Sequence, residues 1–228
     1  MQIIDVIQNT PQWHDVRRCR VTASEFHALL VAGKNKRGLG TGALTMVGQL
    51  VDSIIRDEPA QRWNGNEETD FGHTHEDDAA DLYAEREFKA LEKVGFVIPD
   101  RTDPFARAIG CSPDRLYKQG GQWVHGVEIK CLAKQHYEVF RTGKPFISHV
   151  QQCQFSLRVT GLNYWDLVYY NPEYSKRYKA IKFRILPDPE IFKTIDKKVE
   201  AFRAEAAEQL QQCRKITNTP TPWSWPAA

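Results

Sequence analysis

The segment Val127-Glu128-Ile129-Lys130-Cys131 decides how the rest of this chain is interpreted. Apolar and charged residues alternate along it, which is the pattern of a β-strand whose two faces meet different surroundings. We expect Val127, Ile129 and Cys131 to face the core. Glu128 and Lys130 then lie together on the opposite face of the strand.

A partner for this strand is expected directly upstream. Residues 107–117 and 122–132 have the composition of two strands, and Gln119-Gly120-Gly121 between them is typical of a tight turn. Pairing as a hairpin would bring Asp114 close to Glu128. The sequence therefore predicts a carboxylate pair on one face of a sheet.

Further elements follow from the spacing of apolar residues. Helices are expected within residues 11–30, 44–55, 72–88, 147–159 and 191–210, strands at 164–170 and 179–186, and loops at 33–42 and 57–70. Helices, then a sheet, then helices predict an α/β (α+β) fold with a central mixed β-sheet flanked by helices. We expect a single domain over residues 1–228, with a helical N-terminal portion and a long C-terminal helix.

Composition supports a folded intracellular protein. Of the 228 residues, 41% are hydrophobic and 26% are charged, which is enough for a sizeable core. The N-terminus lacks the pattern of a signal peptide, and no apolar stretch approaches the ~20 residues of a membrane helix. Five scattered cysteines without Cys-x-x-Cys spacing argue against a disulfide framework and a cysteine-based zinc site. We therefore expect a cytoplasmic location.

A metal site would explain the charged face of the central strand. Two carboxylates and a lysine are costly to bury unpaired, and Mg²⁺ prefers hard oxygen ligands. Glu76 supports this reading because it lies on the apolar stripe of its helix, with Ala79, Ala80 and Tyr83. Taken alone, however, a Glu-x-Lys pair is more commonly a solvated strand face, so both readings stay open at this point.

Four blocks of sequence resemble the YqaJ-like viral recombinases, the family of lambda-type phage exonucleases in the PD-(D/E)xK nuclease superfamily with its restriction-endonuclease-like core. The blocks are Trp13-His14…Arg17…Val21-Thr22-Ala23-Ser24-Glu25, Phe71-Gly72…Glu76, Cys111-Ser112-Pro113-Asp114 with Glu128-Ile129-Lys130-Cys131, and Gln151-Gln152-Cys153-Gln154-Phe155-Ser156. They occur in the order of the family, over roughly residues 13–170.

The resemblance implies a role for each matched residue. Asp114, Glu128 and the Ile129 carbonyl are implied ligands of Mg²⁺, for which Mn²⁺ could substitute. Glu76 is implied to hold a second ion, and Lys130 is the implied catalytic lysine that activates water.

The resemblance also implies a pocket for the 5′-terminal phosphate of DNA. The residues that match it are Arg17, Ser24, Ser112 and Gln154, with Thr22 close by. An arginine with hydroxyl and amide donors suits a phosphate dianion. From the residues alone, Thr22 or Ser24 could instead cap the helix that follows.

The implied enzyme is an alkaline 5′–3′ exodeoxyribonuclease of a phage or prophage. As a homotrimeric ring it would digest one strand of linear duplex DNA, processively and without ATP. The 3′ overhang would serve a partner single-strand annealing protein. The alternative is a structure- or sequence-specific DNA endonuclease of the same fold. A non-enzymatic DNA-end protein is a third reading, and the intact Asp114, Glu128 and Lys130 argue against it.

Two departures from the family bear on DNA handling. Residues 66–70 are polar and acidic where the family has an apolar and basic wedge that opens the duplex. His136, with Lys134 nearby, stands where the family has an arginine that tracks DNA. Basic residues cluster at 17–20, 34–37, 130–144 and 176–184, which suits a DNA track on one side of a nearly neutral protein.

Overall fold

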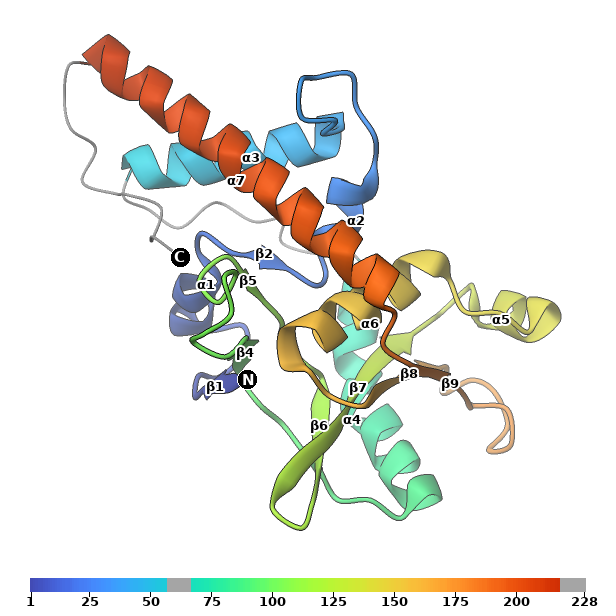
Figure 1. Ribbon diagram of the computed structural model, residues 1–228. Helices are drawn as coiled ribbons and strands as arrows, with labels where there is room; N and C mark the ends of the chain where they lie inside the picture. The colour runs from blue at the N-terminus through green and yellow to red at the C-terminus, as the bar shows by residue number, and fades with distance from the viewer. Residues whose placement is uncertain (57–66, 218–228) are drawn as a thin grey trace.

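A mixed sheet with helices on both faces organises the computed structural model, which describes residues 1–56 and 67–217 (Figure 1). The strands lie in the order β3 (Leu91–Glu92), β6 (Arg115–Gln119), β7 (Gln122–Cys131), β8 (Tyr164–Tyr170) and β9 (Ala180–Ile185). Strands β7 and β8 are parallel, and the other neighbours are antiparallel. The predicted α/β fold with a central mixed sheet is confirmed.

Two short sheets and seven helices complete the described part of the chain. Strand β1 (Gln2–Ile4) pairs with β4 (Phe96–Ile98), and β2 (Val21–Thr22) pairs with β5 (Ile109–Gly110). The helices are α1 (Pro11–Arg17), α2 (Phe26–Leu30), α3 (Thr41–Arg56), α4 (Glu67–Glu87), α5 (His136–Thr142), α6 (Ile147–Thr160) and α7 (Pro189–Thr217).

The predicted hairpin is formed by β6 and β7. Arg115 pairs with Val127, and the strands are joined at Gly120 and Gly121, whose φ angles are 58° and 80°. Two consecutive positive φ values are the requirement of the tight turns that suit the twist of a hairpin, and glycine meets it without steric cost. The turn thereby fixes which residue of β6 lies opposite which residue of β7.

The strand expected at 107–117 is in fact two strands. Strand β5 ends at Gly110 and β6 begins at Arg115, and β5 pairs with β2 rather than with β7. Pro113 lies in the break, and it has no N–H to donate to a ladder. Asp114 therefore precedes the hairpin instead of lying within a strand.

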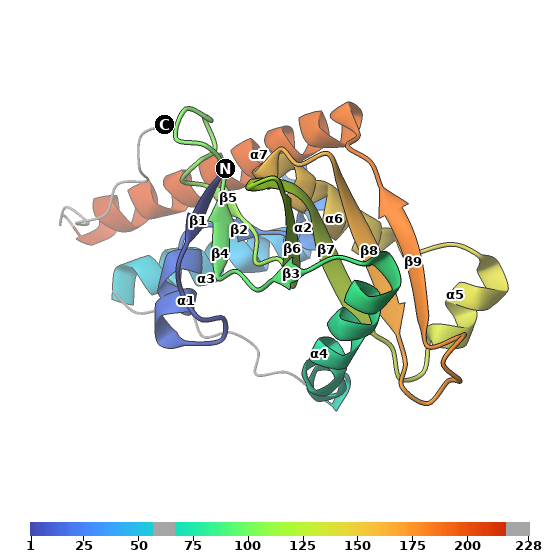
Figure 2. The ribbon, with the colours of Figure 1, turned by 90° about the horizontal axis from the view of Figure 1, so that it is seen from below.

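Helices cover the two faces of the sheet differently (Figure 2). On one face, Ala79, Ala80 and Tyr83 of α4 pack against Val127 and Ile129 of β7, which confirms the predicted apolar stripe. On the other side lie α6 and, beyond it, α7. The face of β7 that carries its charged residues is therefore covered by a helix.

Two helices differ from the sequence prediction. Helix α4 begins at Glu67 rather than near residue 72, so most of the acidic stretch 66–70 is helical. Residue 66 lies outside the described residues. Helix α5 was not expected, because its seven residues are too few to show a 3.6-residue period.

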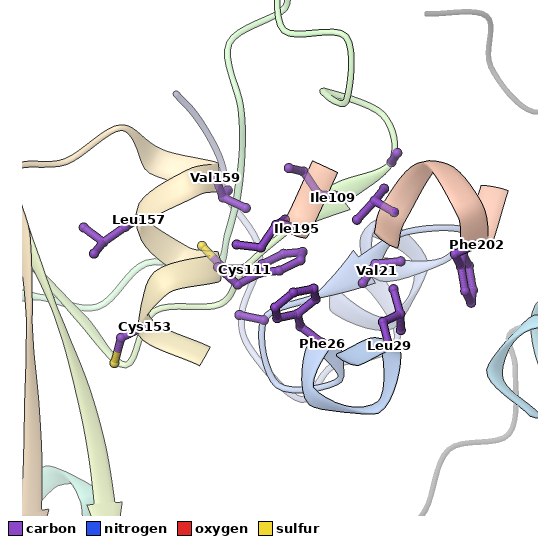
Figure 3. Close-up of a cluster of buried hydrophobic side chains, with 14 of the residues drawn as sticks. Val21, Phe26, Leu29, Ile109, Cys111, Cys153, Leu157, Val159, Ile195 and Phe202 are labelled. Atoms are coloured by element: carbon purple, nitrogen blue, oxygen red, sulfur yellow. The ribbon is translucent and has the colours of Figure 1, made fainter. Parts of the chain in front are cut away.

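The main core lies between α2, α6, α7 and the β2–β5 pair, as Figure 3 shows. It is lined by Val21, Phe26, Leu29, Ile109, Cys111, Cys153, Leu157, Val159, Ile195 and Phe202. The rings of Phe26 and Phe155 lie with their centroids 4.9 Å apart. This core attaches the N-terminal helices to the sheet by packing α6 between them.

All five cysteines fall in the described ranges, and each is a free thiol. Burial raises the pKa of Cys111 and Cys153, which keeps both protonated and unreactive at neutral pH. Within residues 1–56 and 67–217, no helix has the length and apolar character needed to cross a membrane.

The close approach of β7 and β8 gives a stability prediction. A Cβ on Gly126 would lie 2.4 Å from the indole of Trp165, which is fully buried. We expect Gly126→Ala to lower the free energy of unfolding by about 1–3 kcal/mol, because the core is overpacked. Urea denaturation measures the change.

Gly48→Ala is the matched control. Gly48 lies in α3, is exposed, and has no atom within 4 Å of the added Cβ. Removing a helical glycine should raise the free energy of unfolding by about 0.5–1 kcal/mol. A Gly126→Ala protein as stable as the original would contradict the packing described for this strand pair.

Candidate active site

Asp114 and Glu128 lie near one another beside the open end of the β6–β7 hairpin, just after the chain leaves the short strand β5. The Asp114 Oδ2 accepts a hydrogen bond of 2.6 Å from the backbone N–H of Ile129. The Arg115–Val127 register places Asp114 opposite Glu128. The hairpin therefore brings together the two carboxylates that the sequence predicted to be neighbours.

Glu128 is held from two sides on the face covered by α6. Its Oε1 lies 2.8 Å from the Lys130 ammonium and accepts a 2.5 Å hydrogen bond from the Gln152 side-chain amide. The Glu128 side chain is 3% exposed, whereas Lys130 is 26% exposed. Lys130 can therefore reach a molecule at the surface while it stays paired.

Glu76 reaches the same region from α4. Its Oε1 accepts a 2.8 Å hydrogen bond from Arg115, the residue that follows Asp114. The same guanidinium contacts Asp77 and donates to the Asp114 carbonyl at 2.5 Å. An arginine therefore neutralises the third carboxylate of this cluster.

Electrostatic effects between these groups are strong. Burial raises the pKa of the Asp114 carboxyl well above its ordinary value, and the charges of Glu128 and Glu76 raise it further. Burial acts to lower the pKa of Lys130, but Glu128 and Asp114 outweigh it, so the pKa of Lys130 is raised. Negative charge is thus in excess around Asp114, and Lys130 carries a proton.

A cavity of about 730 Å³ opens beside the carboxylates. Asp114, Glu76 and Arg115 form one wall, and residues 5–9 and 92–95 form much of the rest. Gln8 donates to the carbonyls of Val94 at 2.9 Å and of Pro113 at 3.0 Å, which ties the N-terminal segment to the residue before Asp114. The cavity is large enough for hydrated ions or part of a nucleotide to approach.

The donor chemistry at this site fits a hard divalent cation. Within the described ranges, no three histidine, cysteine or acidic side chains are arranged to hold an ion as they lie. Two carboxylates, Asp114 and Glu128, together with a backbone carbonyl supply oxygen ligands, and water and phosphate can complete the shell of Mg²⁺. The charges of Glu128 and Glu76, which add to burial in raising the pKa of Asp114, would attract a cation to this site.

A second cluster forms around Arg17, at the end of α1. Its guanidinium donates to the hydroxyls of Ser112 at 3.1 Å and of Thr22 at 3.2 Å. The Trp13 ring lies 4.1 Å from the guanidinium carbon, and its N–H donates to Ser112 at 2.9 Å. Ser112 lies two residues before Asp114, so this cluster adjoins the carboxylates.

Thr22 and Ser24 belong to this cluster and do not cap the following helix. Their hydroxyl oxygens lie 3.4 Å apart, and Thr22 also donates to the Glu25 carboxylate. Helix α2 has Glu25 at its N-cap position without a side-chain capping bond. The expectation of a capping hydroxyl is wrong because Thr22 lies in β2 and bonds to Arg17 instead.

Gln154 is not joined to the Arg17 cluster by the hydrogen bonds of its amide. The amide donates to the Leu186 carbonyl at 2.8 Å and accepts from the Asp188 N–H at 3.1 Å. Both ends therefore hold the segment between β9 and α7. Its predicted role at a phosphate requires a rearrangement of these bonds.

Some basic residues that the sequence offered for DNA are engaged elsewhere. His136 is fully buried, and its ring nitrogen lies 2.9 Å from the Tyr178 carbonyl, so it cannot track DNA as it lies. Lys36 and Arg37 pair with Glu205 and Glu208 of α7. Much of the predicted basic cluster at 34–37 therefore forms ion pairs with helix α7.

Arg115 and Gln152 were not singled out as site residues by sequence reasoning. Arg115 contacts Glu76 across 39 residues of chain, and Gln152 contacts Glu128 across 24. The available signals were the adjacency of Arg115 to Asp114 and the position of Gln152 in the matched block of residues 151–156. The folded structure shows which carboxylate Arg115 and Gln152 each contact.

Comparisons with known proteins bear on the family and the fold of this chain. The family model described as the YqaJ-like viral recombinase domain matches residues 12–163, which include Arg17, Asp114 and Lys130. No curated protein is significantly similar to the chain in sequence.

Two solved structures share the fold. The alkaline exonuclease LHK-Exo from Laribacter hongkongensis superposes with a TM-score of 0.77 at 23% identity, covering 92% of this chain and 98% of its own. It has also been solved in complex with dAMP. A phage-related exonuclease from Haemophilus somnus 129PT gives a TM-score of 0.64 at 14% identity, covering 88% and 99%.

The raised pKa of Asp114 predicts a pH-dependent effect of its removal. When the pKa of a carboxyl is higher in the folded than in the unfolded protein, its protonated form stabilises the folded state. That stabilisation is lost as the pH rises through the pKa of the folded protein. We expect Asp114→Asn, in EDTA, to raise the free energy of unfolding by about 0.5–2 kcal/mol at pH 8. The gain should disappear as the pH falls toward 4, where the original carboxyl is protonated.

Asp100→Asn is the control, because hydrogen bonds from Thr102 lower the pKa of this exposed carboxyl. It should give no gain at any pH. If Asp114→Asn destabilised the protein at pH 8 as much as at pH 5, burial and the neighbouring charges would not destabilise the ionised Asp114 carboxylate as described.

Proposed function

The chain belongs to the YqaJ-like viral recombinase domain family, and from this premise we propose that it is a Mg²⁺-dependent, ATP-independent exonuclease that digests one strand of linear duplex DNA from the 5′ end. The observation that carries the proposal is the convergence of Asp114, Glu128 and Lys130, of which Asp114 lines a cavity together with Glu76. The names of its structural relatives, an alkaline exonuclease and a phage-related exonuclease, support this reaction class.

The chain's own residues would divide the hydrolysis among them. Asp114, Glu128 and the Ile129 carbonyl would hold the first ion, and Glu76 a second. When bound, Mg²⁺ stabilises negative charge on the phosphate and eases deprotonation of the attacking water. Lys130 would orient that water and stabilise the charge that develops on the scissile phosphate.

Gln152 would support this arrangement from α6. Its hydrogen bond to Glu128 leaves the other carboxylate oxygen available, and it fixes the rotamer of a side chain that is 3% exposed. A ligand carboxylate that is held by a neighbouring donor keeps its orientation when the ion leaves.

The Arg17 cluster would select the 5′ end. Hydrogen bonds link the Arg17 guanidinium to the hydroxyls of Ser112 and Thr22, and the Thr22 hydroxyl to that of Ser24. A guanidinium with hydroxyl groups around it suits a terminal phosphate dianion. Because Ser112 is two residues from Asp114, a strand anchored there by its end would present a nearby phosphodiester to the carboxylates. We expect Gln154 to join this pocket when its bonds to the β9–α7 segment rearrange.

Processive digestion would require the enzyme to stay on its substrate. We propose a ring-shaped homotrimer, as in the resemblance drawn above, whose product is a 3′ single-stranded overhang for a single-strand annealing partner. A mass in solution near three times 26.3 kDa is the expectation.

Digestion of end-labelled linear duplex tests the activity. With 5′-phosphorylated ends and Mg²⁺, label should be lost first from 5′ termini, and EDTA should abolish the loss. Earlier loss of the 3′ label would overturn the polarity. Cutting of covalently closed circles would favour the endonuclease alternative.

Lys130→Ala is the catalytic variant in the same assay. We expect it to lower the rate about 10²–10⁴-fold, because a positioned proton donor and cation is lost. Lys193→Ala on α7, an exposed lysine paired with Glu190, is the matched control and should keep the original rate. Equal rates for both variants would remove Lys130 from the mechanism.

Arg17→Ala tests the end-recognition pocket. We expect its rate on 5′-phosphorylated duplex to fall about 10–100-fold, to that on 5′-hydroxyl duplex, because charged hydrogen bonds to the phosphate are lost. The ratio of the two rates is the measurement, since a general defect lowers both equally. Arg17→Lys keeps the charge and should retain part of the preference.

A further inference from the structure

Arg115 is the one buried cation that touches Glu76 in the described contacts. Its side chain is 6% exposed, and one guanidinium nitrogen lies 2.8 Å from the Glu76 Oε1. The same nitrogen donates to the Asp114 carbonyl at 2.5 Å, and the other contacts Asp77. Three acceptors therefore fix this guanidinium beside the catalytic carboxylates.

Arg115 lies on the carboxylate that a second ion would need. A divalent cation held by Glu76 would bind the carboxylate whose Oε1 Arg115 now contacts, on that oxygen or on the other one. In either case the ion and the guanidinium share one carboxylate of a partly buried cluster, and two cations at such short range repel one another strongly. A second ion therefore binds Glu76 most readily when Arg115 leaves that carboxylate.

We propose that Arg115 is a positioning residue that holds Glu76 in the ion-free protein and makes the second metal position weaker than the first. This rests on the proposed metal site. The first position offers two carboxylates and the Ile129 carbonyl against one cation, Lys130, which lies 2.8 Å from the Glu128 Oε1. The second offers the single carboxylate of Glu76 with a guanidinium already on it, so the two positions fill in order as the Mg²⁺ concentration rises.

The surroundings allow this exchange to occur. Glu76 and Arg115 line the same cavity of about 730 Å³, so a hydrated ion can reach them without unfolding. Asp77 is 68% exposed and also pairs with Lys93 at 2.6 Å, which gives Arg115 an alternative carboxylate when it leaves Glu76. The guanidinium can thus move between two neighbouring acids of α4.

Arginine is suited to this role because its planar fork bonds two acceptors at once. The fork here spans Glu76 and Asp77, adjacent in α4, while its backbone belongs to the hairpin. A lysine at this position would keep the charge, but its single ammonium could not hold both acids in the same geometry.

Binding of Mn²⁺ to the full-length protein without DNA tests the proposal. Free Mn²⁺ is counted by electron paramagnetic resonance during a titration, so the readout does not depend on cleavage. The original protein should bind one ion tightly and a second weakly. Arg115→Gln should tighten the second ion about tenfold or more, because the competing cation is gone from a partly buried site. It should change the first much less.

Two variants control for general charge effects and for misfolding. Lys93→Gln removes a cation from the same cluster but leaves the Arg115–Glu76 pair, and it should shift the second affinity less than about twofold. Arg115→Lys should give an intermediate tightening and serves if Arg115→Gln does not fold by circular dichroism. Glu76→Gln should abolish the second ion in every background.

An unchanged second affinity in a folded Arg115 variant would overturn the proposal, as would an equal shift in Lys93→Gln. These outcomes can be distinguished from those expected if the proposed nuclease function were wrong. If the original protein bound no Mn²⁺ and degraded no DNA, the proposed function itself would be wrong. If it bound Mn²⁺ and degraded DNA while Arg115 variants titrated as the original, only the role of Arg115 would be rejected.

Discussion

The burial of neighbouring carboxylates is the constraint on which the arrangement of this protein depends. Asp114 directly precedes β6, Glu128 lies in β7 and Glu76 lies in α4. Burial raises the pKa of Asp114, and the charges of the other two carboxylates raise it further. Each has a compensating contact, with the Ile129 N–H, Lys130 and Arg115 respectively. A protein that holds acids this close stores electrostatic free energy that a bound cation can release.

The fold supplies the rigidity that such a cluster requires. The hairpin turn sets the register of β6 against β7, so Asp114 and Glu128 are positioned by backbone hydrogen bonds rather than by flexible loops. Helix α4 packs on one face of β7 and brings Glu76, while α6 brings Gln152 to the other. The α2–α6–α7 core then attaches the Arg17 cluster at a fixed distance from the hairpin. Every group of the site is thus tied to a packed layer.

Sequence reasoning was most successful where one local pattern was long and regular. Strand β8, helix α6 and the apolar stripe of α4 followed from periodicity, and the hairpin followed from its glycines. The predictions were wrong where the structure of a segment depends on a partner that its own local pattern does not specify. The break at Pro113 depends on β5 pairing with β2, which no local pattern encodes. Thr22 met the requirements of a helix cap, yet it bonds to Arg17 because β2 carries it there. The short helix α5 has too few residues to show a period.

Local patterns along the chain were enough to indicate the family, the mixed sheet, and the acids and lysine of the central strand, because strand alternation and a few spaced motifs are local properties. Which groups those side chains contact depends on how distant parts of the chain pack together. It placed Arg115 on Glu76 and Gln152 on Glu128, buried His136, and occupied the Gln154 amide with the β9–α7 segment. These contacts join residues 24 to 42 positions apart, so their energies depend on packing that a linear pattern does not contain.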